Sequence, residues 1–420
     1  MSAAAPLGGS VDEWLDWQST LHASEIELGL ARVAEVARRL NLLPLAGRSV
    51  VIAGTNGKGS CAALIESLLT GKGRVGTYTS PHLWRYNERI RIDGTPVADA
   101  DLRGAFVAVE QARGSTPLTY FEYGTLAALW LFAAYEVDFA VLEVGLGGRL
   151  DAVNIVDADV ALITNIGLDH VDWLGPDRDS IGFEKAGVMR TGRPAICADR
   201  DMPATIGAQA AALAAPLWRI GHDFELEADA GTWHWRHAVR RLETPVNDSV
   251  LADNLAGAIA VYEALFDTLP TAENTARACR AQAALPGRRE RVDGMLPIIY
   301  DVGHNGEAVA VLARYLADHP VSGKTHLVLG MLADKPVETV GGILDDVGDQ
   351  FYLAGLDGIS PRGLSSGELA ARLGREREAR MFEDPKRAQQ AALTAGVAGD
   401  RVVVCGSFLT VAHAREQCPS

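Results

Sequence analysis

The stretch SVVIAGTNGKGSCAALIESLL, residues 49–69, decides the fold of this chain. It opens with a run of β-branched residues and continues through glycines, a lysine and a serine. It ends with apolar residues at helical spacing, Leu64 with Leu68 and Ile65 with Leu69. This order predicts a strand, a loop and a helix. The loop between the strand and the helix is therefore the first candidate for a functional site.

The loop Gly54–Ser60 carries the groups that bind phosphate. Its glycines allow backbone N–H groups to converge on an anion, and the helix that follows contributes the positive end of its dipole. Lys58 is placed to reach the terminal phosphates, and the Ser60 hydroxyl is placed to face a magnesium ion. The spacing departs from the general P-loop, because Ile52 stands where the first glycine is expected and Gly59 separates the lysine from the hydroxyl. A nucleoside triphosphate site is nevertheless favoured over a turn without a ligand.

Among nucleotides the sequence favours ATP. A GTPase usually carries an N-K-x-D segment that reads the base, and this chain has none. A second glycine run, residues 145–148, lacks the full G-x-G-x-x-G spacing of a dinucleotide site, so NAD binding is not expected.

The composition is that of a soluble globular protein with more than one domain. The chain has 420 residues, of which 48% are hydrophobic and 22% charged, and such a length favours two or three domains. The 39 lysines and arginines against 54 aspartates and glutamates give a net charge of −15. This excess argues against a nucleic-acid or anionic-membrane partner and for small ligands bound by local charge.

The cysteines predict neither a disulfide framework nor a zinc site, because they show no paired spacing. They are Cys61, Cys197, Cys279, Cys405 and Cys418. A reducing cytoplasm fits this usage. The sequence also has no basic and apolar leader at its start and no apolar run of membrane-spanning length.

Strand-like and helix-like runs alternate after Pro44, which predicts an α/β fold with a doubly wound, mostly parallel sheet. The strand-like runs are SVVIAG, RVGTYTS, DFAVLEVG, VALITNIG and PAICAD. A polar region, residues 223–247, predicts a short β excursion. A Pro-Gly break and a charge cluster at residues 285–294 suggest a linker, in which Arg289 and Arg291 are expected to be solvated. The predicted domains are residues 1–286 and a smaller Rossmann-like α/β domain, residues 287–420.

Three residues suggest a metal site, and two of them, Glu143 and His170, stand near predicted strand ends. Glu143 stands near the end of an apolar strand, where a carboxylate is costly unless it binds a metal or pairs with a cation such as Arg149. His170, next to Asp169, follows the next strand, although a loop histidine is commonly a surface residue or a helix cap. Lys185 lies on an apolar helical face, either snorkelling to solvent or chemically converted, since a buried ammonium would repel magnesium.

Taken together, these segments resemble the bacterial dihydrofolate synthase/folylpolyglutamate synthase family of the Mur ligase superfamily. The resemblance covers nearly the whole chain and is carried by several long and unusual segments. They are LHASEIELGLARV, AGTNGKGS, TSPHLWRYNERIRI, LTYFEYGTLAALWLF, LEVGLGGRLDAVNIVDADVALIT, LDHVDWLGPDRDSIGFEKAGVM, LPGR, DVGHN, GML and VCGSF. The resemblance makes residues 1–286 the ATP- and pterin-binding domain and residues 287–420 the glutamate-ligase domain.

The resemblance implies roles for residues that match the family's motifs. Residues implied to contact ATP are Gly57, Lys58, Gly59, Ser60, Asn254, Arg288 and Asp301, with His304 beside them facing phosphate. Ser80 and Glu143 would bind a first magnesium ion, and His170 would help to bind a second. Lys185 falls at a lysine that the family typically carbamylates, and CO₂ would turn this cation into an anionic oxygen ligand. Lys58, Glu143, His170 and Lys185 are thus the implied catalytic group.

For the pterin, the resemblance points to Thr119, Phe121, Glu122, Asp151 and Ala152. An aromatic ring stacks on a flat heterocycle, and a carboxylate accepts from its amino-pyrimidine edge. The segment near His22 would line the same pocket, and the loop from Thr79 to Arg91 would cover the substrate.

The activity implied is ATP-dependent addition of L-glutamate to dihydropteroate and to the γ-carboxylate of reduced folates, through an acyl phosphate. The site would form between the two domains, which predicts domain closure, in a monomer. A cell-wall ligase is the alternative within the superfamily, but such enzymes usually carry a further N-terminal domain, for which the early phosphate loop leaves no room. A P-loop ATPase switch is the alternative from another class.

Overall fold

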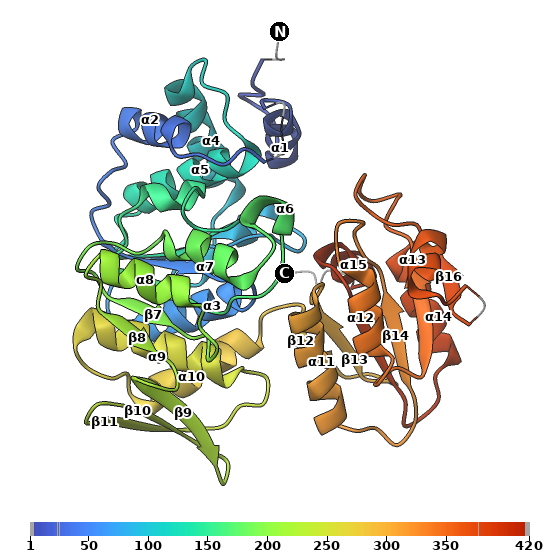
Figure 1. The fold of residues 1–420 in the computed structure, drawn as a ribbon. Coiled ribbons are helices and arrows are strands. Elements are labelled where there is room, and N and C mark those ends of the chain that lie inside the picture. The colour runs from blue at the N-terminus through green and yellow to red at the C-terminus, as the bar shows by residue number, and fades with distance from the viewer. Residues whose placement is uncertain (1–3, 23, 25, 377, 416–420) are drawn as a thin grey trace. The chain divides into compact units, whose positions relative to one another are not determined.

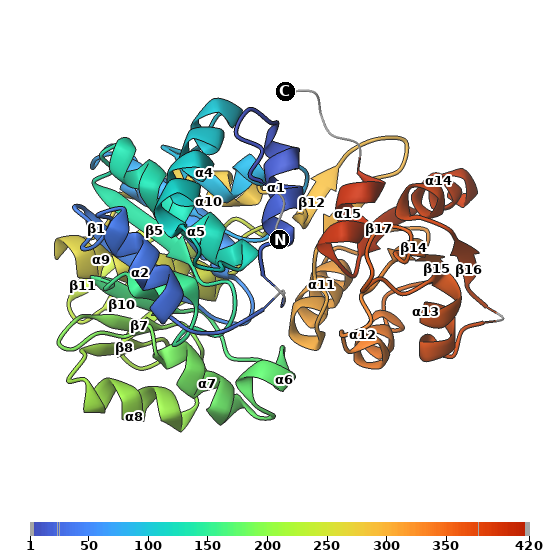
Figure 2. The ribbon, with the colours of Figure 1, turned by 90° about the horizontal axis from the view of Figure 1, so that it is seen from above.

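The computed structural model describes residues 4–22, 24, 26–376 and 378–415. Cys418 lies outside these residues, as do Ala23 and Glu25 of the segment LHASEIELGLARV. The chain divides into two compact units, residues 1–282 and 283–420, and each is described by itself (Figures 1 and 2).

The N-terminal unit is built on an eight-stranded sheet in the order β4-β3-β2-β5-β1-β6-β7-β8. Its strands are β1 Arg48–Ala53, β2 Val75–Tyr78, β3 Ile90–Ile92, β4 Thr95–Pro96, β5 Phe139–Glu143, β6 Val160–Ile163, β7 Ala195–Cys197 and β8 Leu217–Arg219. The six strands from β2 to β8 in this order pair in parallel, whereas β3 and β4 pair antiparallel at one edge. The mostly parallel sheet predicted from the sequence is therefore confirmed.

Helices cover both faces of this sheet. They are α1 Val11–Ser19, α2 Ala31–Arg39, α3 Lys58–Leu69, α4 Asp99–Arg113, α5 Tyr120–Ala134, α6 Val171–Leu174, α7 Arg178–Ala186, α8 Ala204–Ala212, α9 Ala252–Phe266 and α10 Ala272–Ala283, with 3-10 turns η1 Tyr86–Arg89 and η2 Ala152–Ile155. In β1, Val50 and Ile52 pack into a core with α3 and α9, and Val51 and Ala53 pack into a core with α1, α2, α4 and α5. Successive strand residues point to opposite faces, so a continuous apolar run is what a sheet buried on both sides requires.

The predicted β excursion is a three-stranded antiparallel sheet that packs against α9 (Figure 1). Its strands are β9 Phe224–Asp229, β10 Thr232–His237 and β11 Arg240–Pro245. Trp233 and Trp235 alternate with more exposed residues along β10, and both are buried in the core that α9 shares. The alternation of two tryptophans with polar residues is the pattern of a strand with one covered face.

The C-terminal unit is a six-stranded sheet in the order β12-β13-β17-β14-β15-β16. Its strands are β12 Arg288–Val292, β13 Ile298–Asp301, β14 Thr325–Leu329, β15 Gln350–Ala354, β16 Arg380–Phe382 and β17 Arg401–Cys405. Its helices are α11 Gly306–Asp318, α12 Val337–Leu344, α13 Ser366–Leu373, α14 Pro385–Ala395 and α15 Phe408–Ala414. All strands except the antiparallel edge strand β12 pair in parallel, which is the smaller α/β fold predicted.

The expected linker at residues 285–294 is wrong, because its central residues, Arg288–Val292, form β12. Edge strands often carry charged side chains. The charged residues of β12 therefore did not give the apolar pattern from which a strand is predicted. Arg291 is exposed and pairs with Asp293 (Nε–Oδ1 2.9 Å). Arg289 instead lies over the ring of Tyr315, 5.5 Å from its centroid, and burial lowers its pKa. Of the two arginines expected to be solvated, only Arg291 is.

Candidate active site

The loop Gly54–Gly57 joins β1 to α3 in a conformation that leaves the start of the helix open to an anion. Gly57 adopts a left-handed conformation (φ 83°) and caps α3 without a side-chain hydrogen bond. The first backbone N–H groups of a helix have no partner within it, so they point at whatever lies in the loop. Lys58 Nζ donates to the carbonyl oxygens of Gly54 (3.0 Å) and Thr55 (3.1 Å). Gly59 and the buried Ser60 follow in the first turn.

Asn254, in the first turn of α9, lies directly against this loop. A Cβ atom added at Gly57 would stand 2.6 Å from Asn254 Oδ1, so a larger residue at position 57 would displace the amide. Asn254 is 9% exposed. The structure thus brings together two predicted site residues that are almost two hundred positions apart.

The phosphate loop is also tied to the loop that follows β6. Thr55 N donates to Asn165 O (2.8 Å), and Asn56 N donates to Asn165 Oδ1 (2.7 Å). In return the Thr164 hydroxyl donates to Asn56 O (2.6 Å). The loop after β6 carries His170, so these bonds hold a predicted metal ligand in register with the phosphate loop.

Glu143 and Ser80 meet at the carboxyl edge of the sheet. Glu143 ends β5 beside Ile52 of β1, is 3% exposed, and accepts a hydrogen bond from Ser80 N at Oε2 (3.1 Å). The pairing with Arg149 considered above is wrong, because Arg149 pairs with Glu184 (Nη2–Oε1 2.8 Å). A buried carboxylate beside a hydroxyl residue and a phosphate loop has the chemistry of a magnesium site.

Lys185 points into the protein rather than toward solvent. It is 4% exposed on α7, and its Nζ donates to Gly54 O (2.8 Å). The snorkelling alternative is therefore wrong. Lys58 donates to the same oxygen, which puts the two ammonium groups within about 6 Å of each other. Two unit charges at that separation repel by roughly 3 kcal/mol at an effective dielectric constant of about 20.

His170 lies at the rim of the same region. Its backbone is left-handed (φ 54°), its side chain is 36% exposed, and its Nε2 is 4.0 Å from Asp169 Oδ1. Among residues 4–22, 24, 26–376 and 378–415, no three histidines, cysteines or carboxylates gather in a group able to hold a metal ion. A metal here would need further oxygen ligands from a hydroxyl, a phosphate or a modified lysine.

A cavity of about 610 Å³ opens beside these residues, and all five predicted pterin residues line it. Its lining also includes Ser80, Pro81, Arg89, His22 and Ser24, which were expected near the substrate, and His170, which was predicted as a metal ligand. Other lining residues were not predicted; they are Gln18, Ser19, Ile26, Glu27, Leu28, Gly29, Tyr120, Gly145, Leu146 and Leu150. Gln18 and Ser19, on α1, lie outside every segment that carried the resemblance. The other residues lie within such segments, but none of them was assigned a role of its own.

Phe121 presents a flat apolar surface to this cavity. Its ring lies against Gly145, where an added Cβ atom would stand 2.6 Å from the ring. It also packs on Tyr78, with 5.9 Å between ring centroids and an interplanar angle of 33°. A glycine after β5 therefore makes room for the ring, which is suited to stack on a planar ligand.

Asp151 is a buried carboxyl group held by backbone N–H groups. Oδ2 accepts from Gly145 N (3.1 Å) and Leu146 N (2.9 Å), and Oδ1 accepts from Val153 N (3.0 Å). Burial disfavours the charged form and raises the pKa of Asp151 to about 6, although these hydrogen bonds and the charge of Lys58 oppose the shift. Asp151 is therefore poised to be ionised at neutral pH and protonated in mild acid.

Glu122 is already engaged at both carboxylate oxygens. Oε2 accepts from Thr119 N (2.8 Å) in a capping box that begins α5, and Oε1 accepts from Arg32 Nη2 (3.1 Å). Arg32 is a residue that the sequence did not single out. Its charge compensates a carboxylate that is 3% exposed.

In the C-terminal unit, Arg288, Asp301 and His304 gather at one end of β13. Asp301 accepts from Arg289 N at Oδ2 (3.0 Å) and from Gly303 N at Oδ1 (2.7 Å), and burial raises its pKa. Arg288 pairs with Asp301 across the β12–β13 register, and its guanidinium lies 5.3 Å from the ring centroid of Phe408. His304 Nδ1 is 2.9 Å from Val302 O.

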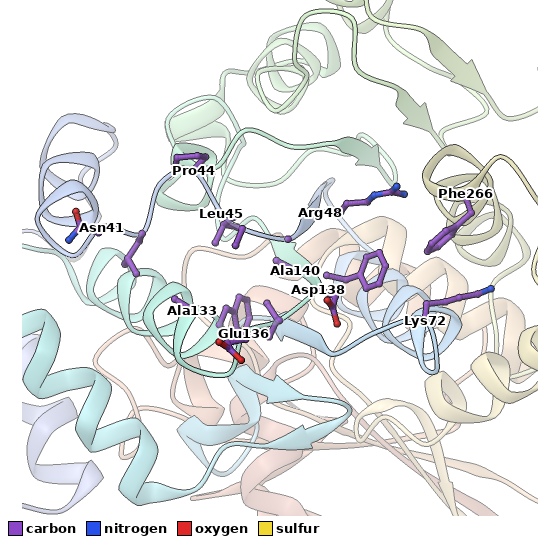
Figure 3. A pocket seen from close by; sticks show the side chains of 16 residues that line it. Asn41, Pro44, Leu45, Arg48, Lys72, Ala133, Glu136, Asp138, Ala140 and Phe266 are labelled. Atoms are coloured by element: carbon purple, nitrogen blue, oxygen red, sulfur yellow. The ribbon is translucent and has the colours of Figure 1, made fainter.

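A second cavity, of about 720 Å³, lies at the amino ends of β1 and β5 and contains none of the predicted site residues. Figure 3 shows Arg48, Lys72 and Phe266 together at one side of it. Arg48 and Lys72 stand 5.7 and 5.5 Å from the ring centroid of Phe266, at the carboxyl end of α9. Cations at that end of a helix stabilise its dipole, which is a structural role.

Two family profiles match the chain. The Mur ligase middle domain matches residues 52–223, and the Mur ligase glutamate ligase domain matches residues 287–408. A dihydrofolate synthase/folylpolyglutamate synthase of Escherichia coli is 44% identical over 415 residues, which are 99% of this chain and 96% of the relative. The chain belongs to the dihydrofolate synthase/folylpolyglutamate synthase family. The resemblance inferred from the sequence is therefore confirmed.

Solved structures of the family share the fold along nearly the whole chain. A structure of Escherichia coli FolC in complex with DHPP and ADP superposes with a TM-score of 0.91 at 42% identity, and covers 97% of each chain. A bifunctional folylpolyglutamate synthase/dihydrofolate synthase with Mn, AMPPNP and L-glutamate bound gives a TM-score of 0.89 at 43% identity, with 98% of each chain covered.

Proposed function

We propose that this chain is an ATP-dependent ligase that joins L-glutamate to dihydropteroate and to the γ-carboxylate of reduced folates. The observation that carries the proposal is the placement, at one edge of one sheet, of an open phosphate loop, a buried carboxylate beside Ser80, and a cavity lined by Phe121 and Asp151. The similar structures described above, which bind ADP with DHPP or AMPPNP with L-glutamate, support it.

The reaction has two steps. An oxygen of the substrate carboxylate attacks the γ-phosphorus of ATP, and the bond between that phosphorus and the β–γ bridging oxygen breaks to release ADP. The amino nitrogen of L-glutamate then attacks the carbonyl carbon of the acyl phosphate, loses a proton, and forms the amide as inorganic phosphate leaves. A carboxylate oxygen is a poor leaving group and a phosphate is a good one, which is why ATP is consumed.

The residues of the chain act by holding and neutralising charge. Gly57, Gly59 and Ser60 would cradle the phosphates at the start of α3, and Lys58 would offset the charge that develops on the transferred group. Asn254, beside Gly57, would hold the nucleotide. The family's motifs assign ATP contacts to Arg288, Asp301 and His304 as well.

Metal ions would be held by residues that fit them. Ser80 and Glu143 form the first site, and His170 contributes to the second. The crowding of Lys185 and Lys58 on the Gly54 oxygen favours carbamylation of Lys185, because the modification removes one of two repelling charges and supplies carboxylate oxygens. Magnesium ions bound there would stabilise the charge on the phosphoryl group.

For the pterin, Phe121 supplies the stacking surface and Asp151 supplies an acceptor for ring N–H groups. Thr119, Glu122 and Ala152 complete the wall. Glu122 acts mainly by fixing the start of α5, because both of its oxygens are engaged.

We place the ATP- and pterin-binding domain in residues 1–286 and the glutamate-ligase domain in residues 287–420, a division supported by the compact units on either side of residue 282. We further propose a cytoplasmic monomer without a nucleic-acid or membrane partner, on the grounds of charge and cysteine usage. Every helix in the described part of the chain is too short or too polar to cross a bilayer.

Phosphate release separates the proposal from an ATPase switch. We expect ATP and magnesium to release phosphate only when dihydropteroate and L-glutamate are both present. A switch would release phosphate with neither, and mass analysis of the product would show no glutamate adduct.

A further inference from the structure

Gln18, on α1, is a buried polar residue in the wall of the 610 Å³ cavity. Its side chain is 1% exposed, and the cavity lining includes it. Neither its amide nitrogen Nε2 nor its amide oxygen Oε1 has a hydrogen-bond partner among the residues that the structure describes. Of the described residues that line the cavity, Gln18 alone has buried side-chain polar atoms in this state.

An unpaired buried amide needs an explanation. Leaving a buried donor or acceptor unsatisfied costs about 1–3 kcal/mol, and native proteins rarely do so. The helix that carries Gln18 is fixed: Ser10 and Glu13 form a capping box at its start, and Trp17 packs edge-on against Tyr123 at 6.3 Å. The amide is therefore held in place and does not escape to solvent by a movement of α1.

Three neighbouring polar side chains on the same wall, those of Ser19, His22 and Arg89, each have a polar partner within the protein. The Ser19 hydroxyl donates to Asp16 O (2.6 Å), His22 contacts Glu27 (Nε2–Oε2 2.9 Å), and Arg89 Nε donates to His82 Nδ1 (2.8 Å). Gln18 differs from all of them, because both of its functional atoms are uncommitted.

We propose that Gln18 is a specificity-determining residue whose amide hydrogen-bonds the heterocyclic head of the substrate; this inference rests on the proposed function. The edge of a pterin presents donors and acceptors side by side. The ionised carboxylates of Asp151 and Glu122 accept hydrogen bonds only, whereas an amide both donates and accepts. Gln18 therefore supplies the donor that the carboxylates lack, and the ligand satisfies the amide.

The test compares the wild-type chain with Gln18→Leu in equilibrium titrations with dihydropteroate, and in steady-state kinetics. We expect the Kd and the KM for dihydropteroate to rise about tenfold, the worth of one such hydrogen bond. The KM values for ATP and L-glutamate should not change. The melting temperature of the ligand-free Gln18→Leu protein should rise, because leucine fills the site without unmet hydrogen bonds. Gln111→Leu, at an exposed position on α4, is the matched control and should alter none of these values.

A substrate analogue makes the test specific to the hydrogen bond. Removing the exocyclic amino group or the ring carbonyl oxygen of dihydropteroate should weaken binding to the wild type more than to Gln18→Leu for at least one of the two analogues. If both analogues lose the same amount of binding affinity in the wild type as in Gln18→Leu, the proposal is overturned. So would an unchanged Kd together with a lowered melting temperature, which would make Gln18 a structural residue. Failure of the proposed function is distinct, because the wild type would then form no glutamate adduct, while the binding titration would still decide the role of Gln18.

Discussion

The raised pKa of Asp151 predicts how the stability of this protein depends on pH. Burial raises the pKa from 3.8 to about 6, so the folded state binds a proton more readily than the unfolded state. The stabilisation from protonating Asp151 is therefore fully present below pH 3.8 and is lost as the pH rises through about 6. At about 1.4 kcal/mol for each pKa unit, the total is roughly 3 kcal/mol, of which about 1 kcal/mol falls between pH 5 and pH 7.

The assay is urea unfolding of the wild type and Asp151→Asn at a series of pH values. Other titrating groups are common to both proteins and cancel in the difference. We expect the unfolding free energy of the wild type, relative to that of Asp151→Asn, to fall by about 1 kcal/mol from pH 5 to pH 7. In Asp151→Asn the side-chain NH₂ group faces backbone N–H groups that are also donors, which lowers the unfolding free energy. This loss is the same at every pH. A constant difference, or one that grows with pH, would refute the reasoning from burial.

Three further substitutions test the site. Lys58→Ala should lower kcat by about 1,000-fold or more with the fold intact by circular dichroism, because it removes charge stabilisation of the transferred phosphoryl group; near-normal turnover would remove the loop from the mechanism. Glu143→Gln should raise the magnesium concentration for half-maximal activity about tenfold or more, and an unchanged magnesium dependence would argue against its role as a ligand. Arg32→Ala should lower the unfolding free energy by about 2 kcal/mol, since it leaves the buried Glu122 uncompensated. Arg38→Ala, whose ion pair is exposed, should cost less than about 1 kcal/mol in the same urea titration, and equal losses would contradict the argument.

The fold was predictable because its strands are local patterns. The run Val50–Ala53 is apolar at every position because its side chains pack alternately into two cores. The tryptophans of β10 alternate with more exposed residues because only one face of that strand is covered. The edge strand β12 was missed because it lacks such a local apolar pattern. Four of its five residues are charged, so neither an apolar run nor a clear alternation marked it.

The phosphate loop could be predicted because its residues are adjacent in the sequence, whereas the residues that surround the site come from distant parts of the chain. Lys185 reaches Gly54 across 131 positions and Arg32 reaches Glu122 across 90. No spacing rule connects such residues, since only the tertiary fold brings them into contact. Gln18 carries no motif, and its interest arises solely from being buried at a cavity wall without a partner.

The transfer of a phosphoryl group from ATP to the substrate carboxylate is the centre of this account, and oxygen isotopes test it most directly. Dihydropteroate labelled with ¹⁸O in its carboxylate is incubated with the enzyme, ATP, magnesium and L-glutamate, and the inorganic phosphate is analysed by mass spectrometry. We expect one labelled oxygen in each phosphate released. Amide formation with unlabelled phosphate would contradict the acyl phosphate route.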